Sequence, residues 1–139
     1  MWWGGAFDHA LTRSVPHQNT LKFPQHSFNT PYQLGSEKSD RADDCDTYEL
    51  KVYAGDMLVM GSDGLFDNVF EGDIVCTAWE TMKQGKSPTQ VAEDLATRAR
   101  ELSMQSERES PFAIAASENG LDLQGGKLDD ITVCVSFVL

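Results

Sequence analysis

The sequence has few cysteines, no long apolar run and only half as many basic as acidic residues. Its three cysteines, Cys45, Cys76 and Cys134, are far apart and lack Cys-x-x-Cys spacing, which indicates neither a disulfide framework nor a zinc site. We interpret Cys76 and Cys134 as small core residues. No segment approaches the ~20 apolar residues of a membrane-spanning helix. We therefore expect an intracellular, soluble protein with no membrane span.

Basic residues number 11 against 22 acidic ones, giving a formal net charge of -11. This charge argues against a nucleic-acid backbone or an anionic membrane as the main partner. A cation is a more natural ligand. The length of 139 residues fits one domain, and nothing in the composition indicates an oligomeric state.

Three segments have the pattern of strands. Asp46 to Tyr53 alternates apolar and polar residues, which predicts a half-buried strand. Met57 to Met60 is continuously apolar, which predicts a buried strand paired with 46–53 in a hairpin. Residues 131–138 alternate again and predict a terminal strand.

Two segments have the pattern of helices. An apolar stripe over 71–83 predicts the first. The second begins at Ser87, with Pro88 in the first helical position and Gln90 completing a capping-box signature. Residues 103–111 read as a charged connection, and 1–20 show no sustained period, so we leave them unassigned, as a loop or a truncated edge. Strands and helices in separate blocks predict an α+β fold with a mainly antiparallel sheet and two helices.

Aspartates stand beside glycines at the ends of two predicted strands. Asp63 and Asp67 follow the strand at 57–61, while Asp129 and Asp130 precede the strand at 131–138. If these strands are neighbours, the four carboxylates converge on one rim, where like charges oppose folding unless a cation neutralises them. Oxygen ligands of this kind select magnesium, manganese or calcium over zinc. Taken singly, each Asp-Gly site is more often only a turn.

These two segments resemble motifs of the PPM-type, or type 2C, metal-dependent protein serine/threonine phosphatases. GSDGLFD at 61–67 is similar to the family motif [SAT]-D-G-[LVI]-[FW]-D, and GGKLDDITV at 125–133 is similar to its late motif ending in D-[ND]-[IM]-[TS]-[VA]. FNTPYQL at 28–34 and the GGK lead-in resemble the organellar branch of mitochondria and chloroplasts.

The resemblance implies that 21–139 form the C-terminal half of an αββα phosphatase sandwich. It implies that Asp63 and Asp129 bind a catalytic Mg²⁺ or Mn²⁺, with Gly64, Asp67 and Asp130 in support. It further implies hydrolysis of phosphoserine and phosphothreonine in a phosphoprotein substrate by metal-activated water, at a two-metal centre without a covalent phosphoenzyme. No catalytic side chain beyond the metal ligands is predicted.

Two other functions stay open. The family's earlier Asp-Gly-x-Gly-Gly segment, whose Asp bridges the metals, and its phosphate-binding Arg cannot be located in this sequence. A catalytically silent, phosphatase-like binding or regulatory module is therefore an alternative. A plain acidic α+β binding domain, in which the Asp-Gly sites are only turns, is a third.

Overall fold

The computed structural model describes residues 9–14, 17–22, 25–35 and 39–139. A four-stranded antiparallel sheet has the strand order β2-β1-β5-β6. Its strands are β1 (His9–Ser14), β2 (His17–Lys22), β5 (Met57–Gly61) and β6 (Val133–Phe137). A small hairpin of β3 (Gln25–Ser27) and β4 (Thr30–Pro31) makes a second, two-stranded sheet.

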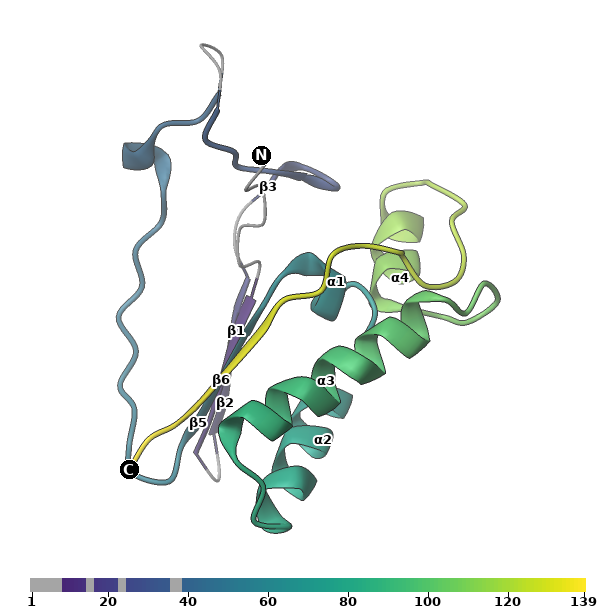
Figure 1. Ribbon diagram of the computed structural model, residues 1–139. Coiled ribbons are helices and arrows are strands. Elements are labelled where there is room, and N and C mark those ends of the chain that lie inside the picture. Colours follow the sequence, from purple (N-terminus) through teal and green to yellow (C-terminus); the bar gives the residue numbers. More distant parts are fainter. Residues whose placement is uncertain (1–8, 15–16, 23–24, 36–38) are drawn as a thin grey trace.

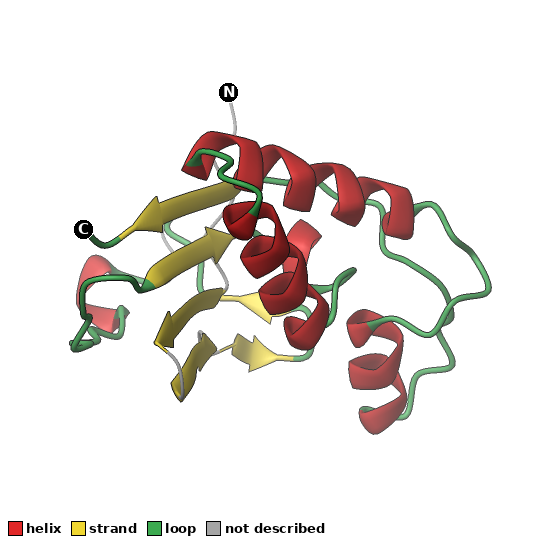
Figure 2. Ribbon diagram, turned by 90° about the horizontal axis from the view of Figure 1, so that it is seen from below, coloured by secondary structure: helices red, strands yellow, loops and turns green. Residues whose placement is uncertain are grey.

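Two long helices, α2 (Glu71–Lys83) and α3 (Pro88–Ser103), cover one face of the four-stranded sheet. Two shorter ones are α1 (Asp63–Phe66), directly after β5, and α4 (Pro111–Glu118), and a 3-10 turn, η1 (Ala42–Asp44), lies in the loop before β5. In Figure 1, α2 and α3 lie beside the sheet and α4 stands past the end of α3. Figure 2 shows the strands as one layer and the two long helices as another. The predicted α+β class with a mainly antiparallel sheet is confirmed.

The core lies between the sheet and the two long helices. Side chains of β5 alternate in burial, with Met57 and Val59 facing the helices. The completely buried side chains of Leu65, Ile74 and Leu95 belong to the same hydrophobic cluster as Met57 and Val59. Since burial of a large aliphatic side chain contributes about 2 kcal/mol, this layer contact fixes the position of β5, and so of the residues that follow it.

The two predicted helices are confirmed. The first spans Glu71–Lys83 as α2. In α3, the Ser87 hydroxyl accepts a hydrogen bond from the amide of Gln90, and the Gln90 side chain accepts one from the amide of Ser87. This capping box satisfies amides at the helix start that would otherwise lack partners.

The predicted strand at 46–53 is wrong, and so is its hairpin with 57–60. Among the described residues this segment pairs with no strand, because the two edges of β5 are already paired with β1 and β6, and it is mostly exposed. Of the two readings given for 1–20, the loop is wrong for the residues that form β1 and the start of β2, while 1–8 and 15–16 lie outside the described residues. The structure adds α1 and α4 to the two helices predicted.

The cysteines also differ from expectation. Cys45, Cys76 and Cys134 are all free and exposed, so Cys76 and Cys134 do not belong to the core. In β6, Val133, Val135 and Phe137 pack against the core while Cys134 lies on the opposite face. In the described part of the chain, no helix combines the length and the apolar character required to cross a membrane.

An ion pair links α3 to the loop that follows α2. Lys86 Nζ lies 2.7 Å from Asp94 Oδ2, which also accepts a hydrogen bond from the Thr81 hydroxyl. The Lys86 hydrogen bond holds the pKa of Asp94 below its usual 3.8. A depressed carboxylate pKa stabilises the fold above pH 3.8, and this stabilisation is lost as the pH falls through the lower folded-state pKa.

We therefore expect Asp94→Asn to lower the free energy of unfolding by about 0.5 kcal/mol near neutral pH, a value typical of a solvent-accessible pair. Urea unfolding at neutral and at strongly acidic pH measures this difference, which should disappear in acid and shrink in high salt. Glu93→Gln, on the same helix and exposed, is the matched control and should change little. A difference that persists unchanged in acid would contradict the assignment.

Candidate metal centre

The two aspartate segments lie at the same end of neighbouring strands. β5 and β6 pair with Gly61 opposite Val133, so the chain leaves β5 where it enters β6. Beyond the strands, the Ser62 amide donates to the carbonyl of Thr132, and the Thr132 amide donates to the Ser62 hydroxyl. The same hydroxyl donates to the carbonyl of Asp130 at 2.9 Å. Ser62 thus joins the two aspartate segments.

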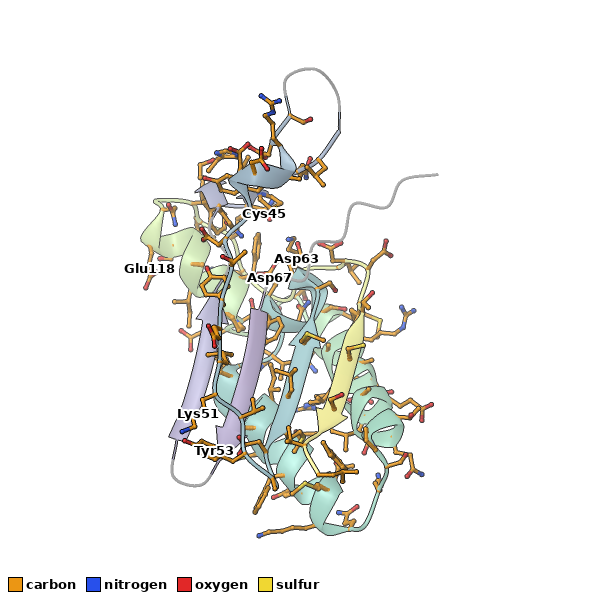
Figure 3. The ribbon with its side chains drawn as sticks, turned by 90° about the vertical axis from the view of Figure 1, so that its left-hand side faces the viewer. Cys45, Lys51, Tyr53, Asp63, Asp67 and Glu118 are labelled. Atoms are coloured by element: carbon orange, nitrogen blue, oxygen red, sulfur yellow. The ribbon has the colours of Figure 1, made fainter. Side chains whose placement is uncertain are left out.

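Three of the four predicted carboxylates gather around one ammonium group. Lys127 Nζ lies 2.7 Å from Asp67 Oδ2, 3.2 Å from Asp63 Oδ2 and 3.3 Å from Asp129 Oδ2. Figure 3 shows Asp63 and Asp67 close together at one end of the sheet, with Lys51 and Tyr53 at the other end. Asp130 differs, because its side chain is exposed and its contribution is the carbonyl bound by Ser62.

Asp63 and Asp129 are held in the same way. In each, Oδ1 accepts the amide of the next residue at 2.9 Å, Gly64 in one case and Asp130 in the other. In each, Oδ2 faces Lys127 and about a third of the side chain is exposed. Each carboxylate therefore presents one oxygen to a shared, solvent-accessible position.

Gly64 lets the two segments approach closely. A Cβ at this position would overlap the carbonyl oxygen of Asp130 and lie 3.0 Å from Cγ1 of Ile131. Only hydrogen fits there, since a Cβ requires about 3.4 Å or more from its neighbours. The supporting role predicted for Gly64 is thus a matter of packing between the two segments.

Asn68 fixes the loop that carries Lys127 and Asp129. Its side chain is completely buried. Nδ2 donates to the carbonyls of Gly64 and Lys127 at 2.9 and 2.8 Å, while Oδ1 accepts the amide of Lys127 at 2.9 Å. One side chain thus connects α1 to the loop before β6.

The start of that loop is anchored on α4 and the end of α3. Ser110, also completely buried, caps α4 and donates its hydroxyl to the carbonyl of Gly125. The amide of Gly126 donates to the carbonyl of Gln105 at 2.8 Å. Gly125 has a φ of 83°, a conformation that favours glycine.

Charge and burial act in opposite directions on the cluster. Burial raises the pKa of Asp67, and the negative charges of Asp63 and Asp129 add to this, while the Lys127 hydrogen bond and charge oppose it. Burial alone would lower the pKa of Lys127, but its hydrogen bonds to Asp67 and Asp63 and their charges raise it well above its usual value. The lysine is therefore a permanent cation among three carboxylates.

The donor set fits a hard divalent cation. Carboxylate oxygens surround the Lys127 ammonium here, and such oxygens are the ligands that Mg²⁺ and Mn²⁺ prefer. Among the described residues, no group of three or more His, Cys, Asp or Glu side chains is arranged to hold a metal. Two carboxylates from Asp63 and Asp129 are compatible with Mg²⁺, which commonly keeps several waters and uses one or two carboxylates.

An open pocket of about 600 Å³ adjoins the cluster. It shares Asn29 and Asp67 with the surroundings of Lys127. Its apolar lining includes Phe28 and Phe112, whose rings stack with centroids 5.5 Å apart and join the β3–β4 hairpin to α4.

Sequence reasoning brought Asp63, Asp67 and Asp129 to one rim, and the structure places them there. It gave no role to Lys127 or Asn68, although both lie in or beside the quoted motifs. For Lys127, the signal was a single cation flanked by aspartates in an acidic chain. Asn68 carried no comparable signal, because its burial depends on the approach of a loop 59 positions away in the sequence.

Comparison with known proteins gives consistent relatives. The chain is 40% identical over 115 residues to probable protein phosphatase 2C 80 of Arabidopsis thaliana, an alignment covering 82% of this chain and 28% of the relative. It is 39% identical over 127 residues to the protein phosphatase PTC7 homolog of Danio rerio, covering 82% of this chain and 41% of that one. No protein-family model matches the chain.

A solved structure agrees. The X-ray structure of the photosystem II phosphatase PBCP matches with a TM-score of 0.83 and 31% identity, over 96% of this chain and 56% of that one. The chain therefore spans only part of the length of these curated and solved relatives. On its motifs, its fold and these similarities, the chain belongs to the protein phosphatase 2C family, the PPM-type phosphatases, and corresponds to part of their α+β domain.

Proposed function

We propose that this chain contributes part of the active site of a protein serine/threonine phosphatase that depends on Mg²⁺ or Mn²⁺. The observation that carries the proposal is the convergence of Asp63 and Asp129 on one cation, the Lys127 ammonium. A site that binds an ammonium through carboxylate oxygens has the charge and the donors for a divalent ion. The phosphatase names of the relatives support the reaction class.

In this proposal Asp63 and Asp129 would hold the metal, while the amides of Gly64 and Asp130 orient the two carboxylates through Oδ1. A bound divalent ion would neutralise charge on the transferring phosphoryl group and lower the pKa of a water molecule for attack on phosphorus. Asp67 holds Lys127, and the carbonyl of Asp130 anchors Ser62. The pocket beside Phe112 would receive a side chain of a phosphoprotein substrate. An organellar location is supported by the likeness to a photosystem II phosphatase.

The test uses Asp63→Asn and Asp129→Asn. Each change removes a negative ligand, so we expect Mn²⁺ affinity to fall by at least about tenfold and metal-dependent hydrolysis of a phosphothreonine peptide to be lost. Calorimetry and phosphate release measure the two effects. Asp122→Asn, an exposed aspartate outside the cluster, is the matched control and should behave as wild type. Unchanged Mn²⁺ affinity in both variants would count against the metal centre.

A catalytically silent, phosphatase-like module is the second candidate. The occupation of the cluster centre by Lys127 favours it, because a resident cation satisfies the carboxylates without metal. The same assay separates the two functions. Turnover of the phosphopeptide that requires Mn²⁺ and disappears in Asp63→Asn excludes the silent module, whereas Mn²⁺ or phosphopeptide binding without turnover supports it.

A further inference from the structure

The ammonium of Lys127 has two sets of partners at different distances, and this asymmetry has a function if the proposed metal centre is right. On one side, Asp67 Oδ2 and Asn29 Oδ1 lie 2.7 and 2.9 Å from Nζ. On the other, the proposed metal ligands lie farther away, at 3.2 and 3.3 Å. The ring of Phe112 also faces Nζ, with its centroid 5.2 Å away.

An ammonium group has three N–H donors, whereas four side-chain oxygens surround this one. The two short contacts each take one donor, the third donates to Asp63 over a longer distance, and Asp129 is an ion-pair partner. These two carboxylates are therefore the weakly bound partners. Asp67, Asn29 and the Phe112 ring would still hold the ammonium if the other two contacts were lost.

We propose that Lys127 is an internal competitor for the metal. Without metal, its ammonium neutralises Asp63 and Asp129; when a divalent ion arrives, the ammonium gives up these two carboxylates and stays on Asp67 and Asn29. The two cations compete for these carboxylates, because like charges a few ångströms apart repel strongly. The flexible four-carbon stem of lysine permits the small movement required. Lys127 thereby sets the metal concentration at which the site fills, and Asp67 is a positioning residue for Lys127 rather than a metal ligand.

A purely structural role for the Lys127 side chain gives the opposite expectation. If the ammonium were needed to hold the loop of 125–130 in place, its loss would weaken metal binding. That loop, however, is anchored through the backbone of Lys127 by Asn68, and through Gly125 and Gly126 by other contacts. None of these bonds uses the Lys127 side chain, so its removal leaves Asp129 positioned.

The experiment is calorimetric titration of the full chain with MnCl₂, comparing wild type with Lys127→Met. We expect the Kd for Mn²⁺ to fall by about 10- to 100-fold, because a positive charge beside both ligands is removed. Lys83→Met, on exposed α2 surface, changes the charge of the chain equally and is the matched control; its Kd should stay within about twofold of wild type. Lys127→Gln retains hydrogen bonding without charge, so it should also bind Mn²⁺ more tightly than wild type. It serves as the test variant if Lys127→Met fails to fold.

A second readout needs no loaded enzyme. Without metal, Lys127→Met leaves three carboxylates unneutralised, so its Tm should lie below that of wild type, and Mn²⁺ should raise it by more than it raises the wild-type Tm. In wild type, Asp67→Asn should weaken Mn²⁺ binding by directing the ammonium onto Asp63 and Asp129. In the Lys127→Met background the same change should have a smaller effect, a coupling that a double-mutant cycle measures.

The outcomes are distinguishable. Equal or weaker Mn²⁺ affinity in both Lys127→Met and Lys127→Gln overturns the competitor role while leaving the metal centre intact. An equal gain in Lys83→Met also overturns it, because the effect would then come from overall charge. No detectable Mn²⁺ binding by any of the proteins overturns the metal centre, and the competitor role with it.

Discussion

Replacing Asn68 with alanine is expected to lower the free energy of unfolding by about 3 kcal/mol, because it leaves buried and partly buried polar groups without partners. The groups that lose a hydrogen-bond partner are the amide and carbonyl of Lys127 and the carbonyl of Gly64. All three depend on one side chain with no exposed surface. Each unsatisfied buried group costs roughly 1–3 kcal/mol, and partial entry of water reduces the sum.

The same change should loosen the loop that carries Asp129, so we expect Mn²⁺ binding to weaken by about 10-fold, the lower end for partners that orient a ligand. Urea unfolding and calorimetric titration measure the two effects on the same protein. Asn119→Ala is the matched control: its Nδ2 also donates to a carbonyl, that of Ala115, at 2.8 Å, but it is exposed. A loss below about 1 kcal/mol in Asn68→Ala, equal to that of the control, would contradict the clamp role.

The two long helices, α2 and α3, were predictable from local chemistry, whereas the pairing of β5 with β1 was not. The start of α3 is predicted by Ser87, Pro88 and Gln90, because the hydrogen bonds of a capping box form between residues that are neighbours in the sequence. The alternation at 46–53 matches a strand equally well in local terms. It fails because β1, a distant segment with no clear pattern, takes the edge of β5 that the hairpin required.

The missed helix α4 had a usable signal. Ser110 and Pro111 repeat the Ser-Pro start of α3, and the Ser110 hydroxyl accepts the amide of Ala113 as a cap. The helix is only eight residues long and two of its residues are buried, Ala113 and Ala116, which is too short a stripe for a clear helical period. The capping residues at the start of a short helix are therefore a stronger sequence signal than the periodicity of the residues that follow.

The candidate site follows a similar division. The convergence of Asp63 and Asp129 was predictable from two strand-adjacent carboxylates, given that the strands are neighbours, and the Gly61–Val133 register provides that arrangement. The sequence did not predict that the Lys127 ammonium lies between them, since this depends on where the lysine side chain points in the folded chain. The reach of Lys127 to Asn29, 98 positions away, belongs to tertiary structure alone.

Gly64 packs directly against the backbone of the loop before β6. Gly64→Ala should destabilise the fold by about 3 kcal/mol, the upper end for overpacking, because the new methyl group overlaps the carbonyl of Asp130. Neither α1 nor the Asp130 carbonyl can move away without a loss of packing or of a hydrogen bond. Gly64 belongs to α1, whose own Leu65 is completely buried, and the Asp130 carbonyl is held by the Ser62 hydroxyl.

Relief of this overlap requires the loop before β6 to move away from α1, which separates the two proposed ligands. We therefore expect Gly64→Ala to weaken Mn²⁺ binding by about tenfold as well, although alanine is chemically inert. Gly72→Ala is the matched control, because Gly72 is also helical, and a Cβ there meets nothing within 4 Å. Since alanine favours the helix over glycine, the control should gain about 0.5 kcal/mol of stability and leave the Kd unchanged. If urea unfolding finds the two variants equally stable, the contact between α1 and the Asp130 carbonyl is looser than described, and the proposed ligands lose the restraint that keeps them together.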